Sequence, residues 1–297
     1  MRTERNPIIV DSSTLLELVP GVWVITDRFI PLVPNVAIIE GKSSVLVFET
    51  GLGPRSGKAV LEKAKEIAGG RDLLLTISHF HPEHGFGAQE FKGVAHIVYN
   101  ELQRMDLLTK GQRYLTMFRD FGPNVADALA GTVLVEPDET YSGFTSIDLG
   151  GRSVELNEVG QAHTLGDQLV WLPQDKIVFA GDLLENKVFP IFPYAPPGDV
   201  DADGNKWIDA LRRIRGLSPT WIVPGHGKIS DNGLLDTVED YMLDLGSKVQ
   251  HYKDLGLDEQ RTAAILGPVI QKSHPDWREP DWVEPAIRCF YNSGFPR

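Results

Sequence analysis

A buried strand that ends in a histidine-rich loop is the feature that most limits how this chain can fold. Residues 73–77 read Leu-Leu-Leu-Thr-Ile, a short apolar run typical of a strand that is covered on both faces of a parallel sheet. His79, His81 and His84 follow it, with Glu83 beside the last of them. Only eight histidines occur in the 297 residues, so three in one short loop are not a chance grouping. The pattern predicts a divalent-metal site at the end of a buried strand.

The overall composition is that of an ordinary globular protein, with 42% hydrophobic and 24% charged residues. A formal net charge of −12 argues against a nucleic-acid partner, because a phosphate backbone is bound by a basic face. No run reaches the roughly 20 apolar residues of a membrane span, and residues 1–7 lack the apolar core of a signal peptide. We therefore expect a cytoplasmic protein without membrane attachment. Cys289 is the only cysteine, which excludes an intrachain disulfide and favours a packing role.

Apolar strand patterns alternate with amphipathic helix patterns along the chain, which predicts an α/β fold. Strands are expected at 21–26, 36–39, 44–50, 73–78, 95–100, 132–141, 153–159, 168–173, 176–181 and 221–223. Helices are expected before Gly69, over 101–130, at 206–216 and in a C-terminal extension over 231–297. Because no low-complexity linker interrupts the chain, we predict a single domain over residues 1–297, with its core at about 20–230.

Three further ligand candidates each follow a predicted strand. They are His163, Asp182 and His226, the last of which stands between two glycines. One histidine at a strand end is more often structural, but three such positions add up to a strong signal because an α/β scaffold places its functional residues at the carboxyl ends of strands. The complete set of ligand candidates is His79, His81, Glu83, His84, His163, Asp182 and His226.

Seven ligand candidates fit two metal ions better than one. A single catalytic zinc takes about three protein ligands and a water, whereas two ions lie roughly 3.5–4 Å apart and share a bridging carboxylate. We expect two divalent ions, zinc in the first place, with iron or manganese as alternatives. The other histidines, His96, His251 and His274, lie outside any ligand context and are interpreted as structural or surface residues.

Five segments in this order resemble the signature of the metallo-β-lactamase superfamily. They are the strand-end acid Glu49, the cluster 79–84, and the segments around His163, Asp182 and His226. The resemblance covers roughly residues 20–230. It implies an α/β fold, a four-layer αββα sandwich that holds one or two metals at the edge of two packed sheets, here with added helices at 101–130 and at the C-terminus.

The resemblance also implies a role for each ligand candidate. His79, His81 and His163 would hold the first metal, and Glu83, His84 and His226 would hold or face the second. Asp182 would bridge the two ions, as in glyoxalase-II-like and lactonase-like hydrolases rather than in β-lactamases. Glu49 would orient a ligand histidine from behind.

Two positions depart from the family pattern, which usually has aspartate where this chain has Glu83 and Glu49. Glu83 is one methylene longer, so it binds the second metal differently or acts only as a base beside it. Our hypothesis is that the two lengthened side chains compensate for each other. It fails if Glu83→Asp keeps full metal content and activity.

The predicted function is that of a dinuclear metal-dependent hydrolase. A metal-bridging hydroxide would attack the scissile carbonyl of a carboxylic ester, lactone, thioester or amide, and Glu83 or Asp182 would orient the nucleophile and move the proton. The small-molecule substrate is expected to be largely apolar, because the candidate pocket residues are aromatic: Phe29, Tyr114, Phe192 and Tyr194. Segment 101–130, which contains Tyr114, fits the core face of two helices better than the lining of a pocket.

Three alternatives to this function remain. The first is an iron-dependent oxidoreductase on the same fold. A sulfur dioxygenase with a single iron would leave three ligand candidates unused, and a di-iron protein with an electron-transfer role would normally bring a flavin domain. A β-lactamase-type amide hydrolase is the second, and a binding module with a vestigial site is the third. Apolar residues near the C-terminus, such as Trp277, Trp282 and Phe290, would either cap the pocket or meet a neighbouring subunit in a homo-oligomer.

Overall fold

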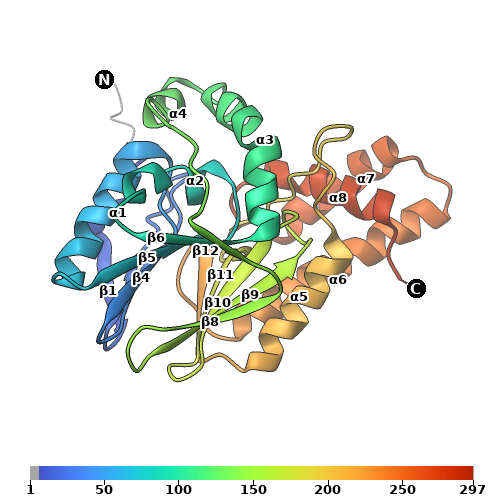
Figure 1. The fold of residues 1–297 in the computed structure, drawn as a ribbon. Helices are drawn as coiled ribbons and strands as arrows, with labels where there is room; N and C mark the ends of the chain where they lie inside the picture. Colours follow the sequence, from blue (N-terminus) through green and yellow to red (C-terminus); the bar gives the residue numbers. More distant parts are fainter. Residues whose placement is uncertain (1–6, 297) are drawn as a thin grey trace. The chain divides into compact units, whose positions relative to one another are not determined.

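Two β-sheets and eight α-helices make up the fold in residues 7–296, the part of the chain that the computed structural model describes (Figure 1). The predicted α/β class is confirmed. The chain divides into two compact units. The first contains the residues up to Glu158 together with Gln168–Asp175, and the second contains Val159–Asp167 and the residues from Lys176 onward.

The first unit is built on a seven-stranded sheet whose strands follow the sequence order. Its strands are β1 (Leu15–Val19), β2 (Val22–Ile25), β3 (Val36–Glu40), β4 (Ser44–Phe48), β5 (Asp72–Thr76), β6 (His96–Asn100) and β7 (Glu139–Tyr141). The strands β1 to β4 form an antiparallel meander. β5 pairs in parallel with β4 and with β6. The parallel pairing that was predicted from the apolar run before the histidine loop is therefore confirmed.

Helices in the first unit are α1 (Gly53–Ala68), α2 (Pro82–Gly85), α3 (Glu101–Arg119) and α4 (Pro123–Ala128), with short 3₁₀ helices at Ser12–Thr14 and Ala88–Phe91. α1 buries Val60, Leu61 and Ala64 on one face and ends at Gly69, which has a left-handed backbone as a C-terminal cap requires. The strand expected at 132–141 is wrong for most of its length. Only its last three residues form β7, and 132–138 run without regular structure.

The second sheet has five strands in the order β12-β11-β10-β9-β8. They are β8 (Phe144–Asp148), β9 (Ser153–Gly160), β10 (Asp167–Leu172), β11 (Ile177–Glu185) and β12 (Trp221–His226). β8, the strand at the edge of the order, was not predicted. Its residues Phe-Thr-Ser-Ile-Asp are exposed or half-buried, so it lacks the continuous apolar signal of β10 and β11, which are buried throughout.

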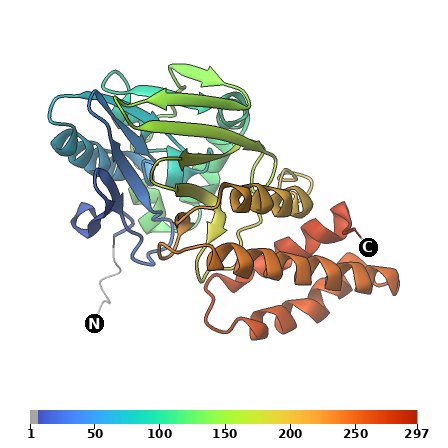
Figure 2. The same cartoon turned by 90° about the horizontal axis from the view of Figure 1, so that it is seen from below.

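The second unit carries α5 (Gly204–Leu217), α6 (Gly233–Asp254), α7 (Glu259–Ser273) and α8 (Val283–Ser293), with a 3₁₀ helix at Pro280–Trp282. α6, α7 and α8 lie together, as the orange and red helices in Figure 2 show. They are the predicted helical C-terminal extension. Among the described residues, no helix combines the length and the apolar character that a membrane crossing needs.

Candidate metal centre

The loop that carries the histidine cluster begins where β5 ends, and its first backbone groups are fixed by two buried amides. The side chain of Gln103, in the first turn of α3, donates hydrogen bonds of 2.8 Å to the carbonyls of Ile77 and Ser78. Gln168 donates to the Ile77 carbonyl at 2.9 Å. Buried carbonyls without such partners would be costly, so these amides hold the strand end that aims His79.

The ligand candidates of the first unit gather on one short turn. The ring of His79 has its centroid 4.5 Å from that of His81 and 4.3 Å from that of His84. Pro82 opens α2 immediately after His81, because its fixed φ suits the first position of a helix. This turn brings Glu83 and His84 back towards His79, and all four side chains are buried.

Glu49 lies behind this turn, directly after β4, and is 1% exposed. Both of its carboxylate oxygens accept hydrogen bonds of 3.2 Å from the backbone N–H of Ser78. Oε1 also lies 3.2 Å from Nδ1 of His84. Glu49 has a φ of 75°, a left-handed backbone that is unfavourable for a residue with a Cβ and persists where the surrounding structure enforces it. The structure thus places this acid against one of the predicted ligand histidines.

Helix α1 approaches the histidine loop backbone to backbone. A Cβ added to Gly57 would lie 2.2 Å from the carbonyl oxygen of Gly87, and one added to Gly87 would lie 2.8 Å from Cα of Gly57. Thr50 ties the same loop from the other end, because its N–H and its hydroxyl both donate to the His84 carbonyl at 2.8 Å. The glycines that follow His84 therefore permit close packing that fixes the loop.

In the second unit, His163 is fixed by its backbone and by its ring. Oδ2 of Asp167 accepts hydrogen bonds from the backbone N–H groups of His163, at 2.6 Å, and Thr164, at 2.8 Å. Nδ1 of His163 lies 2.7 Å from the carbonyl oxygen of Ile191. A carbonyl only accepts, so Nδ1 carries the proton and Nε2 presents its lone pair, which is the tautomer that metal coordination through Nε2 requires.

Asp182 lies between the two histidines of the second unit. Its Oδ2 is 3.8 Å from Nε2 of His163, and its Oδ1 is 3.8 Å from Nε2 of His226. β11 carries the aspartate and pairs in parallel with β12, which ends at His226. A Cβ on Gly225 would lie 2.0 Å from Oδ1 of Asp182, so only glycine allows the carboxylate to lie there.

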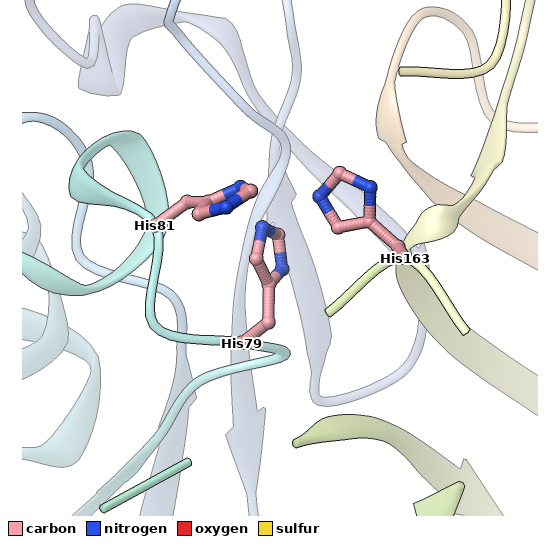
Figure 3. A group of neighbouring side chains, drawn as sticks. All are labelled: His79, His81 and His163. Carbon is pink, nitrogen blue, oxygen red and sulfur yellow. The ribbon is translucent and has the colours of Figure 1, made fainter. Parts of the chain in front are cut away.

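The seven ligand candidates form two groups. His79, His81 and His163 form the first group (Figure 3), and Glu83, His84, Asp182 and His226 form the second. Within each group, one ligand atom from every residue lies within 4.8 Å of the others, and all seven residues are buried. Three imidazole nitrogens suit zinc, and a mixed imidazole and carboxylate set suits zinc, iron or manganese. The donor chemistry therefore fits divalent metal ions.

The four predicted pocket residues have different surroundings. Tyr114 is buried and stacks on His81, with ring centroids 5.0 Å apart. Phe192 is fully buried against Trp207 and Phe290. Phe29 is half-buried with a left-handed backbone. Tyr194 is also half-buried. Burial raises the pKa of its phenol, and electrostatic interactions with Cys289 and Glu259 raise it further. Tyr114 is therefore in direct contact with a ligand candidate of its own unit.

Several residues that fix the ligand candidates were missed by sequence reasoning. The role of Asp167 could have been predicted, because an aspartate four residues after His163, in His-Thr-Leu-Gly-Asp, can accept hydrogen bonds from the backbone N–H groups of the turn. The role of the Ile191 carbonyl could not, because a backbone acceptor leaves no trace in the residue type.

A family model described as the metallo-beta-lactamase superfamily matches residues 30–226, which is more than half of the chain. The chain belongs to the metallo-beta-lactamase superfamily. Membership confirms the resemblance that the five signature segments carried, and with it the predicted α/β fold.

Similar proteins within the superfamily act on different compounds, according to their names. A type 2 metallo-beta-lactamase of Bacillus sp. (strain 170) is 34% identical over 105 residues, which are 34% of this chain and 38% of that enzyme. The acyl-coenzyme A thioesterase MBLAC2 of Homo sapiens is 25% identical over 209 residues, 65% of this chain and 72% of that protein. The chain spans under two fifths of the length of the type 2 enzymes it matches.

A solved structure extends the likeness over nearly the whole chain. The stereoselective inverting sec-alkylsulfatase of Pseudomonas sp. matches with a TM-score of 0.67 at 16% identity, covering 95% of this chain and 50% of that one. At this identity, the match shows the fold. It includes the C-terminal helices, which lie beyond the residues that the family model matches.

Proposed function

We propose that this superfamily member is a metal-dependent hydrolase with a dinuclear centre that cleaves a carboxylic ester, lactone, thioester or amide. The observation that carries the proposal is the pair of buried ligand groups, three histidines in one and Glu83, His84, Asp182 and His226 in the other. Soluble proteins rarely bury so many ionisable groups together unless these groups pair or coordinate metals. Further support comes from the superfamily, whose named relatives here are hydrolytic enzymes.

Asp182 is the residue through which two metal positions would be linked. Its two oxygens face different histidines at the same distance of 3.8 Å, as a bridging carboxylate requires. His79, His81 and His163 would hold one ion, and Glu83, His84 and His226 would hold the other. When bound, the two ions would supply Lewis-acid polarisation of the scissile group and a water activated at neutral pH.

Acidic side chains of the protein would transfer the proton of the attacking water. Glu83 is buried at 5% exposure, one position before His84, and is the carboxylate of its group that comes from the histidine loop. We assign to it the orientation of the attacking water and the transfer of its proton towards the leaving group, which is general acid–base catalysis. Glu49 would keep His84 in place, because its carboxylate reaches Nδ1 of that ring.

The substrate class rests on the surroundings of His81. Phe80 and Tyr114 contact this ring, with centroids 4.9 and 5.0 Å away, and Phe118 follows behind Tyr114. These three rings, which we call the aromatic wall, are buried in the hydrophobic core of the first unit. We take this apolar setting to favour a neutral, apolar acyl group over a polyphosphate, which recruits arginine and lysine forks, although Lys110 lies over the Phe80 ring and Arg113 over the Tyr114 ring. The named acyl-coenzyme A thioesterase among the relatives is in line with an acyl substrate.

A second candidate is the hydrolysis of a sulfate ester. It is favoured by the match to the sec-alkylsulfatase structure, which covers 95% of the chain, including the C-terminal helices. An alkyl sulfate has an apolar tail that would suit the same aromatic wall, but its anionic head calls for a cation near the metals.

Elemental analysis and a substrate panel test the proposal together. The protein, purified without added metal, should contain about two zinc ions per chain, and dialysis against a chelator should abolish hydrolysis until zinc returns. The panel contains a thioester, a carboxylic ester, a lactone, a β-lactam, a primary and a secondary alkyl sulfate, and a phosphodiester. Turnover of acyl compounds supports the proposal, and turnover of alkyl sulfates alone selects the second candidate. Iron with oxygen consumption, or a protein that binds no metal, overturns both.

A further inference from the structure

Glu185 is a buried carboxylate that the proposed mechanism leaves without a role. It is the last residue of β11, three positions after Asp182, and only 1% exposed. A carboxylate in such a place is strongly destabilising unless hydrogen bonds compensate for the lost hydration. Because Glu185 lies on the same strand as the ligand candidate Asp182, we examine whether it contributes to the metal centre.

A two-step connection runs from this carboxylate to a ligand candidate within the second unit. The backbone N–H of Ile191 donates to Oε2 of Glu185 at 3.1 Å. The carbonyl of the same residue accepts the hydrogen bond from Nδ1 of His163 at 2.7 Å. Ile191 is therefore held on its amide side by Glu185 and holds the histidine ring on its carbonyl side.

The segment around Ile191 is anchored at both ends by aromatic residues. Phe189 packs against Trp277, with ring centroids 5.3 Å apart, and its N–H donates to the carbonyl of Arg278 at 3.0 Å. Phe192 packs against Trp207, with centroids 4.8 Å apart. Between these anchors, the hydrogen bond to Glu185 fixes the peptide that enters Ile191, and the carbonyl bound to His163 belongs to the peptide that leaves the same residue.

We propose that Glu185 is a positioning residue for the metal ligand His163. It acts through the main chain of Ile191, fixing the carbonyl that keeps the ring protonated at Nδ1 with Nε2 directed to the metal. The inference rests on the proposed function in so far as His163 binds a metal. Removal of a residue that hydrogen-bonds to a metal-ligating histidine typically lowers metal affinity by about 10- to 100-fold.

Two substitutions at this position separate the hydrogen bond from the volume of the side chain. Glu185→Met fills similar space but removes the acceptor for Ile191, and Glu185→Gln keeps an acceptor oxygen. Glu239→Met is the matched control, because Glu239 is a buried carboxylate of the same unit that binds Arg212 and Arg215 in helix α5. All three proteins are compared with the parent by zinc competition against a chromophoric chelator and by the visible spectrum of the cobalt-loaded form.

Glu185→Met should lower the affinity of one of the two metals by about 10- to 100-fold and change the cobalt spectrum. Glu185→Gln should stay within about threefold of the parent, and Glu239→Met should lose thermal stability while keeping both metal affinities. The inference is overturned if Glu185→Met binds both metals as the parent does, or if Glu239→Met weakens the metals equally. A parent protein that binds no metal refutes the proposed function instead, so the two failures are distinct.

A measurement on the parent and on Glu185→Gln keeps the inference testable if Glu185→Met does not fold. Nitrogen-15 spectra of the zinc-loaded proteins, assigned through His163→Gln, should show this ring protonated at Nδ1 and coordinated through Nε2 in both. A ring coordinated through Nδ1 would contradict the assignment. So would a ring in Glu185→Gln whose Nδ1 proton exchanges as fast as that of the exposed His251.

Discussion

Oε1 of Glu49 lies 3.2 Å from Nδ1 of His84, and both side chains are fully buried. The same carboxylate accepts the N–H of Ser78, one residue before His79. A single acid therefore contacts both ends of the histidine loop, the end that leaves β5 and the end that closes α2. The orientation of the ligand candidates depends on a residue that comes 30 positions earlier than His79 in the chain.

Glu49→Gln tests this relationship. The amide keeps the size of the side chain but removes its charge, so the His84 ring loses the partner that raises its basicity, and we expect metal affinity to fall by about 10-fold or more. Chelator competition measures this affinity. Glu40→Gln is the control, since Glu40 pairs with Arg71 in the same unit without contacting the histidine loop. Equal metal affinities in the two variants would show that Glu49 has only a structural role.

Glu83→Asp tests whether the length of this acid matters. Shortening the side chain by one methylene withdraws the carboxylate by about 1.5 Å, which exceeds the tolerance of a metal–oxygen bond. We expect zinc content to drop from about two to about one per chain, with hydrolysis reduced by two orders of magnitude or more. Glu90→Asp, a few residues further on, should change neither. Full zinc content in Glu83→Asp would make the length irrelevant.

Gly225→Ala tests the close approach of Asp182. The added Cβ would meet Oδ1 at 2.0 Å, so the carboxylate has to move away from His226. We expect loss of one metal and a destabilisation of about 1–3 kcal/mol from overpacking. Gly216→Ala in α5 is the matched control, because nothing lies within 4 Å of its Cβ. There, the helix should gain about 0.5–1 kcal/mol. Unfolding in urea and zinc content decide between the outcomes.

The ion pairs of Glu239 lead us to predict that the stability of the second unit depends on pH. Burial alone would raise the pKa of this carboxyl, but hydrogen bonds from Arg215 and Arg212 outweigh it and hold the pKa below its usual value. A lowered folded-state pKa stabilises the protein above the unfolded value of about 4.3, and this contribution disappears as the pH falls through the folded value. Urea unfolding between pH 3 and 7 should show a steeper acid loss in the parent than in Glu239→Gln. Parallel pH profiles would contradict the assignment.

Cys289 should be unreactive towards thiol reagents in the folded protein. Burial raises the pKa of its thiol to about 12, and the sulfur lies 3.2 Å from the carbonyl of Ala202, to which it donates. Since the thiolate is the reactive form, a disulfide reagent at pH 8 should label the native protein at least 100-fold more slowly than the protein in urea. Both rates are measured by quenching the labelling reaction at successive times and detecting the product by mass spectrometry. Comparable rates would mean that α8 opens readily.

The grouping of the ligand candidates could be predicted from the sequence because their signal is one of residue type and place. Three imidazoles after an apolar run, or a histidine between two glycines, stand out against a chain with few histidines. β5 was predicted as a buried parallel strand from its run of apolar residues, and three of its five residues are buried.

Other features left weaker traces or none. The segment 132–138 resembles a strand in composition but forms no regular ladder, because strand pairing depends on a neighbour that the local sequence does not specify. β8 is exposed along much of its length and carries no apolar alternation. The connection from Glu185 to His163 passes through a backbone group, so its geometry became visible only with the folded chain.

The order in which the ligands occur along the chain has a consequence for biosynthesis. His79 to His84 are made together, whereas His226 follows 142 residues after His84 (226 − 84). At about 5–20 residues per second, a ribosome needs roughly 7–28 s to cover that interval. During this time the nascent chain carries the imidazole and carboxylate cluster without His226, and His163 and Asp182 are added part-way through the interval. If these residues bind metal as proposed, the ions that surround the ribosome would partly decide which metal the protein receives.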